Sequence, residues 1–376
     1  MIRLAGATLA AGIMRPAGAA ERRRVLVLLK LAGGNDGLNT LAPYSDPVYR
    51  RARPTIGLGA DAVLPLGEGL GLHPGLAGLE DAWAAGDLAV VRGVGYRPPD
   101  RSHFRSMDVW ETGGEPGAPG ADGWLTRALD GWPEARPLSM LVIGSDPMVP
   151  VAGGGLTAFA LAGDAAPAAT TGRDGSGPAG NSALAHVLAV QRQLAAVQAG
   201  LAETLAALPD LATPFPEDDL GRRLRLAARL IAGGSPAPVI LVPVAGFDTH
   251  AGQRPVHDGL LAAVGAGLAA LRRALAEAEC WQLATVATYS EFGRRLAENA
   301  SGGTDHGTAG PHLVLGGAIR GGWHGLQPSL TDLEDQDPVP TTDFRSYLAG
   351  LAAAGLGLGR AGAALGGVMP LALRRA

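Results

Sequence analysis

The sequence predicts an α/β protein whose mostly parallel central sheet is sandwiched by helices. Short, continuous apolar runs recur along the chain, and such runs are typical of strands buried on both faces. Helical patterns alternate with these runs, as expected when helices cover both faces of a parallel sheet. With 376 residues, 47% of them hydrophobic and 18% charged, the chain can build a large core.

Five apolar runs define the predicted strands. The first is RVLVLLKLAGG at 24–34, which ends at a pair of glycines. The other four runs lie at 88–95, 137–144, 237–246 and 281–290. Because each run is apolar throughout most of its length, we expect each strand to be covered on both faces.

Helical patterns fill the intervals between the predicted strands. The longest, at 182–207, has the spacing of an amphipathic helix. The predicted helices lie at 74–85, 182–207, 217–233, 256–279 and 343–356.

Residues 152–181 differ from the rest because they are small, rich in glycine and interrupted by proline. A stretch of this length and composition predicts a flexible surface loop or lid. The strands on both sides of it are expected to belong to one sheet, so residues 21–376 are predicted to form a single domain.

The N-terminal stretch MIRLAGATLAAGIMRPAGAA has Arg3, a short apolar run and then Ala17-Gly18-Ala19. This order predicts a signal peptide over residues 1–20 with a small-residue cleavage site. The run is too short to span a bilayer, so we expect export to the periplasm or the extracellular space. A disordered tail or an ordinary first helix is the alternative. A twin-arginine signal would need arginines before the apolar run, whereas Arg22–Arg24 follow it.

Charge and cysteine content exclude several classes of protein. The net charge is −4 and the pI about 6.1, which does not suggest a nucleic-acid partner. Lys30 is the only lysine. The single cysteine, Cys280, rules out an intrachain disulfide and a thiolate zinc cluster, and we expect it to be a buried thiol.

Polar side chains follow nearly every predicted strand. In open parallel sheets, ligands bind beyond the carboxyl ends of the strands. Carboxylates and imidazoles without thiolates suit zinc, manganese or calcium-like ions, and two such ions would bind a phosphate-like group. The side chains are Asn35, Asp36, Asn39 and Thr40; Ser102, His103 and Arg105; Asp248 and His250; Glu291 and Arg294; and Asp305, His306 and His312.

Ser102 has two interpretations, because it opens the predicted helix SHFRSMDVWETG. A serine at this place is commonly an N-cap that satisfies free amide groups. The alternative is a nucleophile or an anion site, since a helix N-terminus favours negative charge. His103 is compatible with either.

Other polar residues have ordinary structural interpretations. His73 is expected to fix a turn before a helix, and His257 to cap a helix or face solvent. His186 lies on the long predicted helix and is expected either at the protein surface or in the core. His324 can be interpreted as either a structural or a functional residue. A solvated face is expected for Arg50, Arg51 and Arg53.

Several long motifs, in order, resemble one large bacterial family, called domain of unknown function 1501. They include LVLLKLAGGNDGLNTLAPYSDPVYRRARPTIGL, LHPGLAGLEDAW, RSHFRSMDVWETG, TYSEFGRRLAENASGGTDHGTAGPHLVLGGAIRGG and TTDFRSYLA. That family is usually exported and is grouped with alkaline phosphatases and sulfatases. The resemblance therefore implies an alkaline phosphatase-like fold with a metal-dependent hydrolase site at the strand ends.

The resemblance also assigns roles to single residues. Asp36 matches the first metal-binding acid, and Ser102 falls where the nucleophile opens its helix. Asp248 and His250 resemble the acid and histidine of another metal site, although one residue separates them instead of three.

The C-terminal motif fits this pattern in two registers. In one, Asp305 and His306 are the acid and histidine of a Thr-Asp-His-Gly signature. In the other, Glu291 is the acid and His306 a later histidine. Asp305 would then orient the imidazole from behind.

The leading hypothesis is an exported hydrolase of phosphate or sulfate esters that acts on a small-molecule or glycan substrate. One or two divalent ions (zinc, calcium, magnesium or manganese) would be held by metal ligands, and Ser102 or a metal-activated water would attack. The expected metal ligands are Asp36, Asp248, His250, Glu291 and His306, with Asp305 and His312 as further candidates. Arg105 or Arg294 would neutralise charge on the ester oxygens. The alternatives are a non-catalytic protein of the cell envelope that binds a ligand or partner, and a metal kept only for stability.

Overall fold

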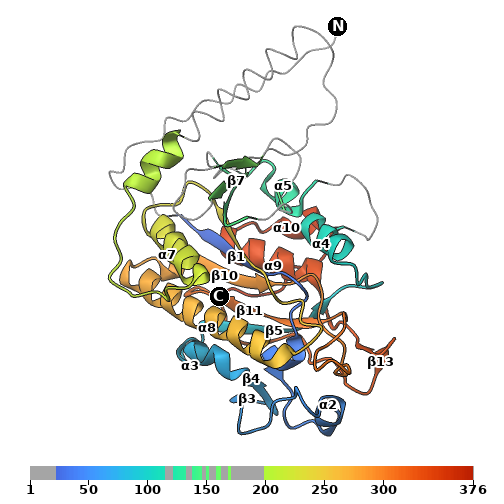
Figure 1. Cartoon of the computed structure of the whole chain (residues 1–376). Helices are drawn as coiled ribbons and strands as arrows, with labels where there is room; N and C mark the ends of the chain where they lie inside the picture. Colours follow the sequence, from blue (N-terminus) through green and yellow to red (C-terminus); the bar gives the residue numbers. More distant parts are fainter. Residues whose placement is uncertain are drawn as a thin grey trace, which may run out of the picture.

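The computed structural model describes residues 23–114, 122–132, 138–145, 150–151, 158–161, 168–170 and 199–375. Its central feature is a ten-stranded sheet in the order β12-β5-β11-β10-β1-β9-β6-β7-β8, with β15 paired to β5 (Figure 1). Among the described strands of this sheet, β8 and β11 run against their neighbours and the others are parallel. The prediction of a mostly parallel sheet is confirmed.

All five predicted strands are present in the sheet. They are β1 (Val25–Leu31), β5 (Leu88–Gly95), β6 (Met140–Ile143), β9 (Val239–Val244) and β10 (Ala284–Tyr289). The remaining strands are β7 (Ala158–Leu161), β8 (Ala168–Thr170), β11 (Gly310–Leu315), β12 (Gly322–His324) and β15 (Thr342–Asp343). Two of these, β7 and β8, lie within the range 152–181, so its described parts extend the sheet.

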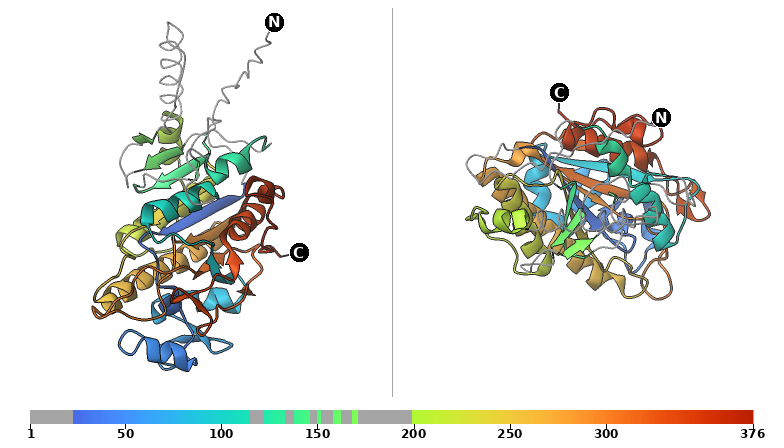
Figure 2. Two further views of the ribbon diagram at one scale, coloured as in Figure 1. Left: turned by 90° about the vertical axis from the view of Figure 1, so that its right-hand side faces the viewer. Right: turned by 90° about the horizontal axis from the view of Figure 1, so that it is seen from above.

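Helices cover both faces of the sheet (Figures 1 and 2). Val25, Val27 and Leu29 of β1 pack against one layer, and Leu26 and Leu28 against the other, because successive strand residues point to opposite faces. The first layer contains η1 (Pro74–Leu79), α3 (Glu80–Ala84), α7 (Asp219–Ala232) and α8 (Gln253–Glu277). The second contains α4 (His103–Thr112), α5 (Trp124–Leu129), α9 (Phe344–Leu356) and α10 (Ala361–Ala364).

The helix predictions are confirmed at 217–233, 256–279 and 343–356. The predicted helix at 74–85 is divided into the 3-10 helix η1 and the short α3. Of the predicted 182–207 helix, residues 199–206 are helical and Ala207 is in a turn. Residues 182–198, which include His186, lie outside the described residues, as does the predicted signal peptide.

Two small sheets and a few short helices complete the fold. One sheet joins β2 (Leu41–Ala42), β4 (Leu70–Leu72) and β3 (Leu64–Gly67), and the other pairs β13 (Leu333–Glu334) with β14 (Asp337–Pro338). The short helices are α1 (Gly37–Thr40), α2 (Pro47–Ala52) and η2 (Trp281–Leu283).

Helix α8 is long and apolar enough to cross a membrane by length and composition. However, 56% of its most apolar window is buried, and it packs against η1 and α7. A core helix of a soluble protein has the same properties. Close to its end, Cys280 is fully buried, as predicted.

Arg53 contradicts the prediction of a solvated face. Arg50 and Arg51 are exposed, but Arg53 is only 1% exposed. Its Nη1 donates to Asp36 Oδ2 at 2.6 Å and to Asn39 Oδ1 at 2.9 Å. The buried Asp36 carboxylate needs a cationic partner, and Arg53 at the end of α2 is placed to provide it.

The predictions for His73 and His257 have different outcomes. His73 Nδ1 accepts from the Gly75 amide and caps η1, as predicted. His257 neither caps a helix nor faces solvent, because it is buried inside α8 with Nε2 3.0 Å from Asn35 Oδ1. Burial lowers the pKa of His257 to about 4.

His312 lies in β11 within an aromatic part of the core. Its ring stacks on Tyr347 at 5.4 Å and meets Trp110 edge-on at 5.5 Å. Burial lowers the pKa of His312 to about 3, so the imidazole is neutral in the folded protein near pH 7.

Replacing Arg53 by glutamine should lower the free energy of unfolding by about 3–5 kcal/mol, because Asp36 would be left as an uncompensated buried charge. Urea unfolding followed by circular dichroism would measure this. The control Arg51→Gln is expected to change stability by less than about 0.5 kcal/mol. Equal effects of the two variants would contradict this account of the ion pair.

His312 should make the protein sensitive to acid. Above its ordinary pKa of 6.5 the ring is neutral in both the folded and unfolded states. Between pH 6.5 and about 3 the unfolded chain binds a proton that the folded protein does not, so stability falls as the pH falls. His312→Phe should reduce this slope by up to about 1.4 kcal/mol per pH unit. Urea unfolding at pH 4, 5, 6 and 7.5 would test it, and parallel curves for the variant and the unchanged protein would refute it.

Candidate functional site

The candidate site forms where several chain segments leave the same edge of the sheet. Strands β9, β1 and β10 are adjacent and parallel, so their carboxyl ends meet. Asp248 and His250 follow β9, Glu291 follows β10, and His103 opens α4 after β5. His306 lies between β10 and β11, where residues 305–307 pair with residues 293–295 through backbone hydrogen bonds.

Three imidazoles converge on one carboxylate there. Asp248 Oδ1 lies 3.0 Å from His250 Nε2 and 3.1 Å from His306 Nε2. Its Oδ2 lies 3.5 Å from His103 Nε2. The two Nε2 atoms of His250 and His306 are only 2.9 Å apart. We call these four residues, His103, Asp248, His250 and His306, the histidine cluster.

Each imidazole of the cluster is held through its Nδ1 atom by an oxygen. His103 Nδ1 lies 2.9 Å from Glu291 Oε1, and His306 Nδ1 lies 2.8 Å from the Arg101 carbonyl oxygen. His250 Nδ1 is 3.4 Å from Asp305 Oδ1. A carbonyl or an ionised carboxylate only accepts hydrogen bonds, so each Nδ1 carries the proton. In the neutral rings, the Nε2 atoms therefore present lone pairs to the centre of the cluster.

Converging lone pairs and a carboxylate need a positive charge between them. Two unprotonated Nε2 atoms at 2.9 Å from each other, both about 3 Å from a carboxylate oxygen, repel unless a proton or a metal ion intervenes. The ligand atoms of His103, Asp248 and His306 also lie within 4.8 Å of one another. Metal-bound histidines commonly donate their second ring nitrogen to a carboxylate or a carbonyl, as here. The cluster could therefore hold a divalent cation.

Asp248 is fixed by the buried guanidinium of Arg294. The Arg294 Nη2 donates to Asp248 Oδ1 at 2.7 Å, and the same side chain donates to backbone carbonyls of Gly33, Gly34, Phe247 and Thr304. Partial burial raises the pKa of Asp248, but the hydrogen bond and the positive charge of Arg294 outweigh burial and lower it to about 2. The Asp248 side chain remains 47% exposed, so one side of the cluster is open to solvent.

Glu291 is a buried carboxylate behind His103. Its Oε1 accepts from the Gly33 amide at 2.8 Å as well as from His103. Burial raises the pKa of Glu291, yet these hydrogen bonds lower it below its usual value. The hydrogen bond with Glu291 in turn raises the pKa of His103. Glu291 thus orients His103 instead of entering the cluster.

Two glycines explain how the segments come so close. Gly33 has a φ of +121°, and a Cβ there would lie 2.3 Å from the Asp248 amide nitrogen. At Gly307, directly after His306, a Cβ would lie 2.5 Å from the Arg294 carbonyl carbon. Gly33 and the single glycine of the TDHG segment, Gly307, are therefore needed for backbone packing beside the cluster.

Other predicted site residues lie outside the cluster. Asp36 is fully buried and accepts hydrogen bonds from Arg53, Gln253 and the Leu38 amide; burial raises its pKa, but the charge of Arg53 outweighs this and lowers it. His312 is in the aromatic core described above. Arg105 is exposed on α4, 3.8 Å from Asp100. Asp305 touches His250, and not His306 as the second register supposed.

Ser102 occupies the N-cap position of α4 with extended backbone angles. Among the described residues, its hydroxyl makes no capping hydrogen bond and no hydrogen bond to the cluster. Its backbone amide donates to Asp100 Oδ1 at 2.8 Å, which fixes the N-cap directly before the helix begins at His103. The structure thus shows Ser102 as an exposed neighbour of the cluster.

Sequence reasoning missed several groups that hold the cluster. Asn299 donates to Asp305 Oδ1 and to the His250 carbonyl, and its position in the polar ENASGG stretch was a usable signal. Gln253 bonds both Asp36 and Thr304 from the start of α8. The Arg101 carbonyl belongs to the backbone, so no residue type could have indicated it.

Solved structures with a similar chain path were found at low similarity. Ps i-CgsB in complex with k-i-k-neocarrahexaose has a TM-score of 0.43 and 11% identity over 92% of this chain and 73% of that chain. The PsFucS1 sulfatase from Pseudoalteromonas sp. has a TM-score of 0.40 and 13% identity, over 89% of this chain and 68% of that chain. BT1596, a 2-O GAG sulfatase, has a TM-score of 0.37 and 11% identity, over 93% of this chain and 72% of that chain. Scores this low say nothing about the chemistry of the site.

Comparison with protein sequences gives a firmer result. No curated protein matches the chain. A family model described as "protein of unknown function (DUF1501)" matches residues 168–355, which include β9, α8, β10 and three of the four cluster residues. The match spans half of the chain and agrees with the resemblance seen in the motifs. The chain belongs to the DUF1501 family.

Proposed function

We propose that the protein is an exported, divalent-metal-dependent hydrolase of phosphate or sulfate esters. The observation that carries the proposal is the convergence of three imidazole Nε2 atoms on Asp248, each imidazole being oriented through Nδ1 by an oxygen acceptor. The ester class follows from the resemblance of SHFRSMDVWETG and TDHG to motifs of phosphatases and sulfatases. Export is proposed from residues 1–20, whose pattern predicts a signal peptide.

The ligand atoms favour one metal ion of intermediate softness, such as zinc. Asp248, His250 and His306 lie closest together, with contacts of 2.9–3.1 Å, and would be the ligands. Imidazoles suit zinc, whereas magnesium and calcium prefer oxygen ligands only. Asp36 is saturated by Arg53, Gln253 and the Leu38 amide, so it does not supply a second site. One zinc or manganese ion therefore fits this arrangement best.

A divalent cation bound there would stabilise negative charge on the oxygens of the ester. The residues of the chain prepare the site in three ways. Arg294 holds Asp248 in place, although its saturated guanidinium is not free to bind the ester itself. Asp305 and the Arg101 carbonyl keep the Nε2 lone pairs of His250 and His306 directed inward. Three ligands, with Asp248 partly exposed, leave room for the substrate, as catalytic sites require.

His103 is proposed to move a proton at its Nε2 atom. It stands farthest from Asp248, at 3.5 Å, and Glu291 holds its Nδ1 at 2.9 Å. An imidazole oriented by a carboxylate is a common general acid or base in hydrolysis. In this role it would protonate the leaving oxygen of the ester.

Variants of the cluster should separate metal binding from turnover. His306→Ala is expected to lose the metal, and with it hydrolysis of aryl phosphates or sulfates. His103→Gln should keep the metal content but lower kcat by about 10²–10⁴-fold, because only proton transfer is removed. His324→Gln serves as a control outside the cluster. Elemental analysis and a panel of aryl esters are the measurements.

The same experiment distinguishes the alternatives. Loss of metal in His103→Gln as well would mean four protein ligands and a closed, structural ion. A stoichiometric metal without turnover of any ester would favour a non-catalytic role. A protein that binds no divalent metal at all would refute the proposal.

Ser102→Ala tests the nucleophile. Because the Ser102 hydroxyl has no hydrogen bond to the cluster among the described residues, we expect kcat within about tenfold of the unchanged protein, with water as the attacking group. Loss of a true nucleophile costs far more, about 10⁴-fold or greater. A drop of that size with the metal retained would instead assign the attack to Ser102.

A further inference from the structure

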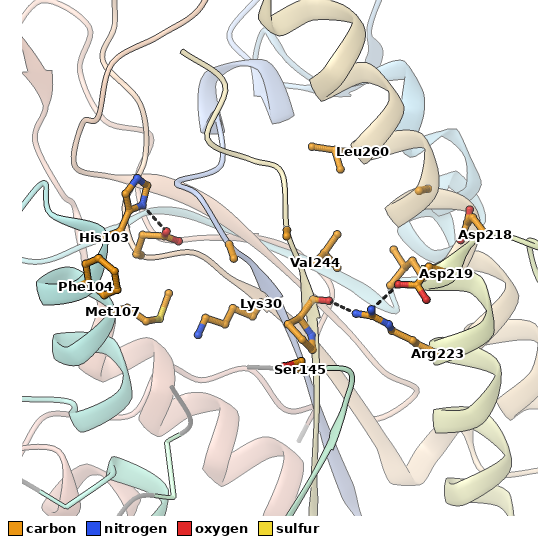
Figure 3. Close-up of a pocket in the computed structure, with 16 residues that line it drawn as sticks. Lys30, His103, Phe104, Met107, Ser145, Asp218, Asp219, Arg223, Val244 and Leu260 are labelled. Atoms are coloured by element: carbon orange, nitrogen blue, oxygen red, sulfur yellow. Dashed lines mark hydrogen bonds and ion pairs between the residues drawn. The ribbon is translucent and has the colours of Figure 1, made fainter. Parts of the chain in front are cut away.

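A cavity of about 630 Å³ opens directly beside the histidine cluster (Figure 3). His103 lies at one end of the lining, with Glu291 hydrogen-bonded to it, and Arg223 of α7 lies at the other end. Its volume is typical of a site for a small organic ligand. A substrate whose reacting group lies at the cluster would therefore extend its remaining part into this cavity.

Much of the described lining is apolar. Phe104 and Met107 come from α4, Val244 from the end of β9, and Leu260 from α8. Phe104 is 80% exposed although it adjoins His103. An exposed aromatic ring at the mouth of a cavity offers a large apolar contact area to a ligand.

Several charged side chains of the described lining already have protein partners. Arg223 donates to the Pro243 carbonyl at 2.9 Å and pairs with Asp219 at 2.5 Å. Asp218 accepts from the Gly221 amide at 2.6 Å, and Lys30 lies 3.4 Å from Glu111.

A sugar in this cavity would have to compete for these groups or leave its hydroxyls against apolar side chains. Either costs free energy, because desolvated hydroxyls need hydrogen-bond partners. An alkyl or aryl group has no such requirement and gains from leaving water.

We propose that this cavity binds the apolar alcohol part of the substrate, so that the preferred esters carry an alkyl or aryl group and not a sugar. The identity of the ester rests on the proposed function above. The preference of the cavity rests on its lining alone.

Three phosphate monoesters of primary alcohols test the preference: n-octyl phosphate, ethyl phosphate and galactose 6-phosphate. Their leaving groups are all primary alkoxides, so differences in kcat/KM report mainly on binding of the alcohol part. The metal-loaded full chain should prefer the octyl ester to the ethyl ester by at least about 100-fold, since each buried methylene is worth roughly a fourfold gain. The galactose ester should be no better than the ethyl ester. The matching sulfates are run in parallel.

Binding without turnover gives a second readout. Titration calorimetry of n-octylphosphonate and methylphosphonate should show tighter binding of the octyl compound. Leu260→Ser should weaken n-octylphosphonate about tenfold and leave methylphosphonate unchanged, because it removes one apolar wall. Val256→Ser is the matched control: it lies four residues earlier on α8, is 48% exposed and does not line the cavity.

The outcomes separate this inference from the proposed function. If n-octylphosphonate binds tightly and Leu260→Ser weakens it, the inference holds even when no ester is hydrolysed. If esters are hydrolysed but the galactose ester is as good as the octyl ester, and Leu260→Ser changes nothing, the inference is overturned while the hydrolase remains. Equal affinity for octyl- and methylphosphonate also overturns it.

Discussion

The guanidinium of Arg294 is the interaction on which the site depends. It bonds the carbonyls of Gly33 and Gly34 at the exit of β1, that of Phe247 after β9 and that of Thr304 before His306. One buried cation thus joins three segments that are far apart in the sequence, and its remaining contact fixes Asp248. Because its donors are satisfied within the protein, its contribution is to position the other groups.

Around this centre the protein arranges a second layer of oxygen acceptors. Each imidazole has one such acceptor at its Nδ1 atom, and the three acceptors come from different segments: Glu291, Asp305 and the Arg101 carbonyl. Their common effect is to direct three Nε2 lone pairs toward one point. The nearby Arg294 guanidinium offsets the negative charge of Asp248 but makes no hydrogen bond to the imidazoles. Such an arrangement is unfavourable on its own and becomes favourable when a cation is bound. Asp36 likewise needs a positive charge beside it, and there the Arg53 side chain provides that charge permanently.

Much of the fold could be predicted from the sequence, because long apolar runs and helical spacing determine it locally. The strand β11 was missed, since GPHLVL is short and begins with glycine and proline. His103, Asp248, His250 and His306 were all named as candidates, and the structure brings them together. The roles of Asp36 and Arg53 could not be foreseen. Whether a carboxylate after a strand faces a ligand or an arginine depends on contacts between distant segments, which residue types alone do not specify.

The position of β1 in the sheet has a consequence for biosynthesis. It is the first strand among the described residues, yet its two neighbours are β9 (Val239–Val244) and β10 (Ala284–Tyr289). The apolar segment VLVLLKL therefore has no strand partner on either side until more than half of the polypeptide has emerged from the ribosome. Strand pairings between residues so far apart in the sequence form slowly, and apolar surface stays exposed until they form. Until those partners are made, this apolar segment is open to aggregation with other chains.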